Sequence, residues 1–340
     1  MKVAVVTGPG AVELRDEQLG PLAPDDLAIG IAACGLCTME RRLFTGEKAI
    51  YPVAPGHEAA GHVVEVGTAV RGLPGVAQIG DLVAVDLWDR CGVCRPCRRG
   101  RSAVCTRPQG AQLSDGTIAM GAGLADFLHI PARNAYRIDA PVEHAAMGEP
   151  VACAVHSVRL SGLHAGDRTA IVGAGYMGRL HLAVARAHGA APVGLIDVSA
   201  ERLAQARSAG AGWTSEPDRA LEVGGPQDVV FVTAGTAGAV ERAVDLVADG
   251  GTVVLYGAFP KDLAARIPAD AVHHREISVV GVLNQEPEDW RTAAGLISAG
   301  TIASDLDALV TARFRLADVG AAFAHATDNP VFRVIVGNRL

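Results

Sequence analysis

The sequence predicts an α/β protein with a doubly wound parallel sheet in one domain and a second, β-rich domain. The chain has 340 residues, of which 49% are hydrophobic, so it is long enough for two separate cores. Residues 168–197 read as a buried strand, a glycine-rich turn, a helix and a second strand. Short apolar runs separated by glycine and proline fill residues 1–86, a pattern typical of β structure.

The β-rich part begins with short strands, which we expect at residues 3–6, 12–14, 27–31, 62–66 and 82–85. The third of these runs into Cys34 and Cys37, whose spacing fits a zinc site, a redox pair or two buried thiols equally well. His57 follows on a turn next to two prolines, with Glu58 as its neighbour. Imidazole and carboxylate downstream of a cysteine fit a catalytic zinc site, which needs about three protein ligands and an open position.

Four further cysteines follow the pattern C-x2-C-x2-C-x7-C in a lobe at about residues 88–107. Four thiolates at this spacing can close a tetrahedral site with no open position, so we expect a structural zinc ion there. Free thiols in a loop, the alternative, would leave the clustering unexplained. The four residues are Cys91, Cys94, Cys97 and Cys105.

Residues 173–178 read G-x-G-x-x-G, between a strand expected at 169–172 and a helix that begins within the motif. The first glycine permits the tight turn, the second lets the backbone approach a pyrophosphate, and the third lets the helix pack close to the strand. The helix N-terminus then offers free N–H groups to the phosphates. This predicts a dinucleotide site, with an ordinary glycine-rich crossover as the alternative. The expected contacts are Gly173, Gly175, Tyr176, Met177 and Gly178.

The next strand, expected at residues 193–196, ends at Asp197, about 20 residues after the motif. A carboxylate there can bind a ribose 2′-hydroxyl and would repel a 2′-phosphate, so NAD is favoured over NADP. Arg202 nearby could instead pair with a phosphate. Turns at Ala234 and Gly257 are expected at the C-terminal ends of later strands, where nicotinamide and ribose bind in such folds.

The remaining elements complete both domains. Further strands of the sheet are expected at residues 229–234, 251–256 and 278–283, with helices at 200–209 and 290–299. Strands at 310–314 and 331–336, around a helix at 318–326, are expected to return to the first domain. We therefore place a β-rich domain at residues 1–147, a Rossmann-type cofactor domain at 148–299 and a return segment at 300–340.

Composition limits the class of protein. The net charge of −7 argues against nucleic acid as a partner. The apolar run at residues 3–6 is too short for a signal peptide, and no apolar run reaches the length that spans a membrane. We therefore expect a cytoplasmic protein with no membrane partner, in which clustered cysteines hold metal rather than form disulfides.

These motifs together resemble the zinc-dependent medium-chain dehydrogenase/reductase family, the alcohol and polyol dehydrogenases. The segment GHEAAGHVVEVG, the four-cysteine lobe, the VGAGYMG turn and the segment AGTAGAVERAVDLVADGGTVVLYG follow the family's order and spacing over nearly the whole chain. The resemblance implies a GroES-like catalytic domain with the Rossmann domain inserted before its last segment. It also implies one catalytic and one structural zinc ion, an alcohol substrate, hydride transfer to NAD, and a homodimer or homotetramer.

The resemblance also assigns the catalytic zinc ligands. The family's first ligand, in a G-x-C-x-[ST]-D context, matches Cys37, and its histidine ligand matches His57. Glu58 matches a glutamate that ligates zinc or stands next to it in the polyol branch. The Glu-Pro of that branch, with a histidine seven residues later, matches Glu149. Cys153, four residues after Glu149, is a rival ligand.

The chain departs from the family's proton relay. The family's Ser or Thr two residues after the cysteine ligand is Met39 here, which has no exchangeable proton, and the histidine of many relatives is Arg42. The family's aspartate three residues after the ligand is Glu40, which could still orient His57. The groups that could carry the proton instead, with a water, are Thr38, Glu58 and Glu149.

We therefore expect a zinc-dependent, NAD-linked dehydrogenase that oxidises a secondary alcohol of a polyol, sugar or cyclitol to a ketone. Three alternatives stay open. A primary alcohol or aldehyde dehydrogenase of the same family would be favoured if Cys153 binds the zinc. An epimerase or lyase that oxidises its substrate transiently would be favoured by the altered relay. A zinc- and nucleotide-binding sensor would bind the cofactor without any hydride exchange.

Overall fold

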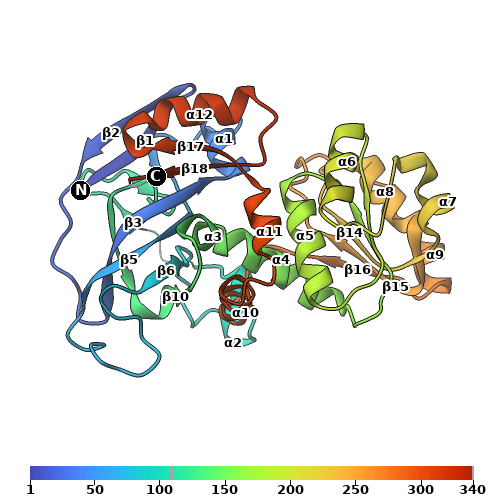
Figure 1. The fold of residues 1–340 in the computed structure, drawn as a ribbon, viewed down its shortest axis with the longest axis horizontal. Helices are drawn as coiled ribbons and strands as arrows, with labels where there is room; N and C mark the ends of the chain where they lie inside the picture. Colours follow the sequence, from blue (N-terminus) through green and yellow to red (C-terminus); the bar gives the residue numbers. More distant parts are fainter. Residues whose placement is uncertain (108–110, 339–340) are drawn as a thin grey trace. The chain divides into compact units, whose positions relative to one another are not determined.

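The computed structural model describes residues 1–107 and 111–338, and the chain divides into two compact units (Figure 1). The first unit comprises Met1–Pro150 and Glu286–Leu340, and the second comprises Val151–Gln285. The return to the first unit lies at Glu286, earlier than the junction after residue 299 expected from the sequence. The difference arises because helix α10 (Pro287–Ser298) packs on α3 (Val142–Ala146) and β10 (Ala135–Arg137) of the first unit.

Two sheets form most of the first unit. The smaller has the strand order β2-β1-β4-β8-β7. The larger has the order β10-β6-β5-β3-β18-β17, and β9 also pairs with β3. Their strands, besides β10, are β1 (Lys2–Gly8), β2 (Ala11–Asp16), β3 (Asp26–Leu36), β4 (Val53–Ala54), β5 (Glu58–Val66), β6 (Leu82–Val85), β7 (Ala111–Gln112), β8 (Ile118–Ala119), β9 (Phe127–Pro131), β17 (Val310–Arg315) and β18 (Arg333–Gly337).

Strand β3 lies inside the larger sheet and leads directly to the candidate metal ligands. Its side chains Leu27 and Ile29 are fully buried, and each burial of this kind contributes about 1.5–3 kcal/mol. β18 pairs with β3 in antiparallel register, with Val336 opposite Cys34. A segment that follows the second unit in the chain therefore completes the sheet beside β3.

Short helices surround these sheets. Besides α3 and α10 they are α1 (Thr38–Thr45), α2 (Arg95–Arg98), α11 (Ala303–Asp307) and α12 (Val319–Asp328). Helix α1 is absent from the expected elements because only Glu40 and Leu43 of its residues are buried, so no apolar period marks it. In the part of the chain that the structure describes, no helix has both the length and the apolar character needed to cross a membrane.

The second unit is built on a six-stranded sheet in which all neighbouring strands are parallel. Its order, β13-β12-β11-β14-β15-β16, reverses direction between β11 and β14, as in a doubly wound Rossmann sheet. The two units confirm the predicted fold class. The elements are β11 (Thr169–Val172), β12 (Val193–Ile196), β13 (Trp213–Ser215), β14 (Gln227–Val232), β15 (Val247–Leu255), β16 (Ser278–Gly281), α5 (Tyr176–Ala187), α6 (Ala200–Ser208), α7 (Ala220–Gly224), α8 (Ala237–Leu246) and α9 (Ala269–His274), while α4 (Gly148–Ser161) contains the first junction.

Candidate active site

One buried carboxylate brings Cys37 and His57 together. Cys37 follows β3 and is the N-cap of α1, and His57 directly precedes β5, which pairs with β3. Glu40, in the first turn of α1, is 1% exposed. Its Oε1 lies 2.9 Å from Nδ1 of His57, and its Oε2 accepts a hydrogen bond from the Cys37 N–H at 3.0 Å. Because Nδ1 of His57 is engaged in this way, Nε2 is the nitrogen left to bind a metal.

The charges around His57 are mostly negative. Burial lowers the pKa of the His57 imidazole, but Glu40 and Cys37 outweigh it and raise that pKa well above 6.5. Burial also raises the pKa of the Glu40 carboxyl, but His57 and hydrogen bonds from the backbone bring that pKa below 4.5. The raised pKa of His57 and the lowered pKa of Glu40 both indicate that each is surrounded by charges of the opposite sign. The negative groups near His57 therefore favour a cation beside the imidazole.

Glu58, the first residue of β5, is fully buried next to His57. Its carboxylate occupies space that Gly35 leaves open, since a Cβ at position 35 would lie 2.2 Å from Oε2 of Glu58. Arg333, on β18, places Nη2 3.0 Å from Oε1 of Glu58 and donates from Nη1 to the Leu36 carbonyl at 2.5 Å. Burial raises the pKa of Glu58 to about 7, although Arg333 and His57 oppose the shift. The arginine therefore supplies the opposite charge that a buried carboxylate needs.

Two sets of donor atoms meet at His57. The ligand atoms of Cys37, Glu40 and His57 lie within 4.8 Å of one another, and so do those of His57, Glu58 and Glu149. Glu149 is half-buried in the first turn of α4. Thiol, imidazole and carboxylate are the groups that bind Zn²⁺ in proteins, and the negative surroundings suit a divalent cation. The residues present therefore fit a zinc ion.

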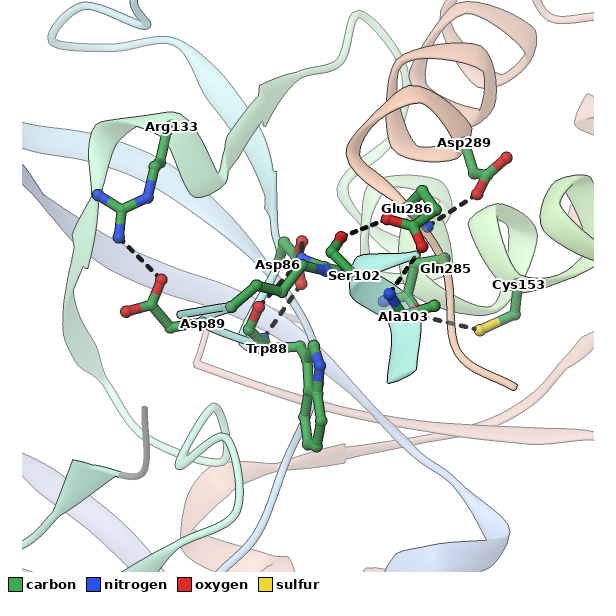
Figure 2. A network of polar contacts seen from close by, with 11 residues as sticks. Asp86, Trp88, Asp89, Ser102, Ala103, Arg133, Cys153, Gln285, Glu286 and Asp289 are labelled. Atoms are coloured by element: carbon green, nitrogen blue, oxygen red, sulfur yellow. Dashed lines mark hydrogen bonds and ion pairs between the residues drawn. The ribbon is translucent and has the colours of Figure 1, made fainter. Parts of the chain in front are cut away.

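The rival ligand Cys153 has another partner. Its Sγ donates a hydrogen bond to Oε1 of Gln285 at 3.3 Å, as Figure 2 shows. Within residues 1–107 and 111–338, Cys153 belongs to none of the donor groups close enough together to hold a metal. Glu149 is thus the carboxylate of α4 that lies beside His57.

The four-cysteine lobe forms a separate group of donors. The sulfur atoms of Cys91, Cys94, Cys97 and Cys105 lie within 4.8 Å of one another. Backbone N–H groups of Cys94 and Arg107 donate to the sulfurs of Cys91 and Cys105 at 3.4 Å each. Backbone hydrogen bonds lower the pKa of Cys94 to about 6, whereas burial and the neighbouring thiols raise that of Cys97 to about 12. A cation is required before all four can be thiolates at neutral pH, so this set fits a structural zinc ion.

The predicted dinucleotide turn joins β11 to α5. Gly173 has a φ of +111°, which favours glycine, and a Cβ at Gly178 would lie 1.8 Å from the Gly173 carbonyl oxygen. A Cβ added to Gly175, the N-cap of α5, would meet no described atom within 4 Å. Tyr176 and Met177 form the first turn of α5, where backbone N–H groups have no acceptor within the helix. Close packing below the turn and open space above it fit a pyrophosphate.

Asp197 lies directly after β12 and is 8% exposed. Its Oδ2 accepts a hydrogen bond from the Ala174 N–H at 2.8 Å, and its Oδ1 accepts one from the Ser199 N–H at 2.9 Å. Nη1 of Arg202 lies 3.8 Å from Oδ2. The carboxylate is therefore fixed against the glycine turn, and its remaining lone pairs can accept from a hydroxyl.

The other two expected cofactor contacts lie at strand ends. The Ala234 N–H donates to the Val172 carbonyl at 3.1 Å, and the Gly257 N–H donates to the Val232 carbonyl at 2.9 Å. Ala234 and Gly257 thus follow β14 and β15 at the edge of the sheet where the parallel strands end, which is also where Asp197 lies.

Two contacts, one made by Arg333 and one made by Lys48, were not expected from the sequence. Arg333 stands in no motif, and only the pairing of β18 with β3 brings it to Glu58. Lys48 lies in the loop after α1, with Nζ 3.3 Å from Sδ of Met39. Thr38, one of the three groups that the sequence offered as a proton carrier, is exposed at the start of α1.

Known proteins resemble the chain over nearly its whole length. Residues 23–140 match the family described as the alcohol dehydrogenase GroES-like domain, and residues 177–299 match the family described as zinc-binding dehydrogenase. L-threonine 3-dehydrogenase of Thermococcus kodakarensis is 31% identical over 334 residues, which cover 93% of this chain and 91% of that protein. D-xylulose reductase A of Aspergillus niger is 28% identical over 341 residues, which cover 94% and 91%.

A solved structure agrees with these relatives. A protein described as a zinc-binding dehydrogenase of Sinorhizobium meliloti, bound to NADP, is 32% identical to this chain and has a TM-score of 0.88. The match covers 99% of this chain and 98% of that one. The chain therefore belongs to the zinc-dependent medium-chain dehydrogenase family, as its motifs predicted, and is an oxidoreductase that acts on CH–OH groups.

Proposed function

We propose that this chain oxidises a secondary alcohol of a polyol, sugar or cyclitol to the ketone, with NAD as the hydride acceptor. The observation that carries the proposal is the meeting of one thiol and three carboxylates at the imidazole of His57, which come from Cys37, Glu40, Glu58 and Glu149. The relatives named for threonine and xylulose support the substrate class, because each handles a hydroxyl or keto group on an inner carbon.

In this proposal Cys37, His57 and Glu149 hold the catalytic zinc, with Glu58 beside it. A zinc ion there supplies a Lewis acid to the substrate hydroxyl, and the nicotinamide supplies the hydride acceptor. Glu40 holds the imidazole of His57 in one orientation through Nδ1. The proton of the hydroxyl leaves through Glu58 or Glu149 with a water, because Met39 carries no exchangeable proton.

The second zinc of the proposal lies in the four-cysteine lobe. Metal analysis of the purified protein should give two zinc ions per chain. Cys97→Ser should remove one equivalent and lower the melting temperature, because the lobe is then left without a closed site. Cys153→Ser, which changes a cysteine outside the donor groups of both proposed zinc sites, should keep both zinc ions. Two equivalents in Cys97→Ser would contradict the structural site.

NAD is proposed over NADP because of Asp197. Its carboxylate is held in one orientation by hydrogen bonds from the N–H groups of Ala174 and Ser199. A 2′-phosphate on the ribose would therefore be repelled by a fixed negative charge. Arg202 is the residue that could offset this repulsion, but its Nη1 already lies 3.8 Å from Asp197.

We also propose that the chain forms a homodimer or homotetramer. β16 ends the sheet of the second unit, and Val279 on β16 and Leu283 after it are 37% and 59% exposed. An edge strand with exposed apolar side chains is suited to pairing with a second copy. Light scattering after gel filtration would measure the mass. Val279→Lys should reduce this mass, whereas Val223→Lys, which changes an exposed residue of α7, should not. A monomer at all concentrations would contradict this assembly.

The direct test incubates the zinc-loaded protein with NAD and a panel of polyols, sugars, cyclitols and simple alcohols, and follows NADH. NADH formation with members of the first three classes would support the proposal. Product without net NADH would favour transient oxidation instead. If no member of the panel gave NADH or any other product, with both zinc ions and NAD bound, the proposal would be contradicted.

A further inference from the structure

Met39, which interrupts the expected proton relay, contacts the side chain of Lys48. Helix α1 ends at Thr45, and its C-cap Gly46, with a φ of +86°, turns the chain back. The Lys48 N–H then donates to the Arg42 carbonyl at 3.0 Å. The loop therefore returns alongside the helix, and Nζ of Lys48 lies 3.3 Å from Sδ of Met39. Both residues are half-buried. A cation is thus held next to the second residue after Cys37.

The thioether of Met39 is a poor partner for an ammonium, because its sulfur is only a weak acceptor. The carboxylates close to Lys48 in the sequence are engaged elsewhere. Glu40 contacts His57, and Glu47 lies 3.5 Å from Nε of Arg42. Among the residues that the structure describes, no carboxylate forms an ion pair with Lys48. Its ammonium therefore has three donors and no opposite charge beside it.

The position also lies at the positive end of a helix. Met39 belongs to the first turn of α1 (Thr38–Thr45), where the helix dipole disfavours cations and favours anions. The one carboxylate of that turn, Glu40, is buried against His57. Glu40 already accepts the Cys37 N–H at this end of the helix, so the Lys48 ammonium beside Met39 is the half-buried positive charge that an anion would stabilise.

We propose that Lys48, which lies beside Met39 on the loop after α1, binds an anionic group of the substrate, either a carboxylate or a phosphate monoester. The inference rests on the proposed function, because Cys37, two residues before Met39, belongs to the zinc site that would take the reacting hydroxyl. It narrows the substrate from polyols in general to hydroxy acids or polyol phosphates. Lys48 is then a specificity-determining residue.

The first test compares anionic substrates with a neutral counterpart in the zinc-loaded protein with NAD. Gluconate and sorbitol 6-phosphate would each be compared with sorbitol. Lys48→Met should lower kcat/KM for the anionic substrate on the order of tenfold to a hundredfold, mainly through KM, and leave sorbitol nearly unchanged. Lys48→Arg should restore most of the loss. Lys2→Met, which removes an exposed lysine paired with Asp16, should change neither value.

The same assay can overturn the proposal. An equal loss for sorbitol and the anionic substrates would give Lys48 a structural or proton-transfer role. A wild-type enzyme that prefers sorbitol to both anions would also contradict it. A selective loss for only one of the two anions would identify carboxylate or phosphate as the group recognised.

A binding test does not depend on turnover. The chain has three lysines, Lys2, Lys48 and Lys261, so acetylation of each by acetic anhydride can be followed by mass spectrometry. Inorganic phosphate or gluconate should slow the acetylation of Lys48 and leave that of Lys2 unchanged, whereas sorbitol should protect neither. Absence of protection by both anions would overturn the inference even in an active enzyme. Protection of Lys48 without NADH formation from any alcohol would support the anion site while the proposed oxidation failed.

Discussion

The carboxylate of Glu286 accepts a hydrogen bond from the backbone N–H of Ala103 at 2.7 Å and a second from the Ser102 hydroxyl (Figure 2). Glu286 is 5% exposed and stands directly before α10, where its own N–H donates to Oδ2 of Asp289 at 2.7 Å. Ser102 and Ala103 belong to the short helical turn that leads to Cys105. One carboxylate therefore joins the start of α10 to the loop that carries the last cysteine of the lobe.

Glu286→Gln should loosen the lobe. A hydrogen bond to a charged group contributes about 1.5–3 kcal/mol, so we expect the free energy of unfolding to fall by roughly that amount. One equivalent of zinc should also be released faster to a chelating dye, because Cys105 loses its support. Glu288→Gln, which changes an exposed glutamate of the same helix, is the matched control. Equal rates of zinc release in the two variants would show that the contact between Glu286 and the lobe does not hold Cys105 in place.

The proton path can be tested by ranking three variants. Thr38 is exposed, whereas Glu58 and Glu149 lie beside His57. We therefore expect Glu58→Gln and Glu149→Gln to lower kcat by about a hundredfold or more, the usual size of a lost acid–base group, and Thr38→Ala to have little effect. Zinc analysis of each variant distinguishes a lost proton carrier from a lost metal. The reverse ranking would assign the proton path to Thr38.

Asp197→Asn should change the choice of cofactor. The variant removes the charge that repels a 2′-phosphate and weakens the acceptor for the ribose 2′-hydroxyl. We expect the wild-type enzyme to favour NAD, and the variant to lose about tenfold or more in kcat/KM for NAD while gaining relative activity with NADP. Glu201→Gln, a neutralised exposed residue of the following helix, should leave the ratio unchanged. A wild-type preference for NADP would refute the role given to Asp197.

His181 should make the second unit sensitive to acid. It is fully buried against Phe231 and Tyr256, its Nδ1 contacts the Met177 carbonyl at 2.7 Å, and burial lowers its pKa to about 4. Below pH 6.5 the His181 side chain binds a proton in the unfolded chain, whereas in the folded chain it does so only below about pH 4. The free energy of unfolding therefore keeps its full contribution from neutral His181 above pH 6.5. As the pH drops from 6.5 to 4, this free energy falls by about 1.4 kcal/mol per pH unit.

Denaturant unfolding at several pH values would measure this effect. His181→Leu should flatten the decline between pH 6.5 and 4, even if it lowers stability at neutral pH. His188→Leu is the matched control, because the exposed His188 makes the same type of contact, from Nδ1 to the Val184 carbonyl at 2.9 Å. Parallel curves for the wild type and His181→Leu would show that His181 is not the acid-sensitive group.

The sheet of the second unit could be predicted because its signals are local. Thr169–Val172 and Val193–Ile196 are continuous apolar runs, which is how parallel strands buried on both faces read, and both occur at the expected residues. The glycines at 173 and 178 act within one turn, so their spacing alone is informative.

The features that escaped prediction depend on distant partners. The apolar positions of α10 show that Trp290 and Ile297 are buried, but not that they pack on the first unit, so the junction at Glu286 was placed too late. The Arg333–Glu58 ion pair connects β18 with β5, which lie on either side of β3 in the sheet. No local sequence pattern predicts this pair. Lys48 reaches Met39 only because α1 forms and the chain turns back after it.

The pairing of β18 with β3 sets an order of events on the ribosome. The second unit, Val151–Gln285, is one continuous segment. In contrast, β3 pairs with β18, a strand that is synthesised only after the whole second unit. The nascent chain can therefore complete its nucleotide-binding half while the zinc-binding half is still an open sheet. Until β18 is synthesised, Glu58 has no Arg333 beside it, so a metal ion that binds early would meet a site with one positive charge fewer than the finished enzyme has.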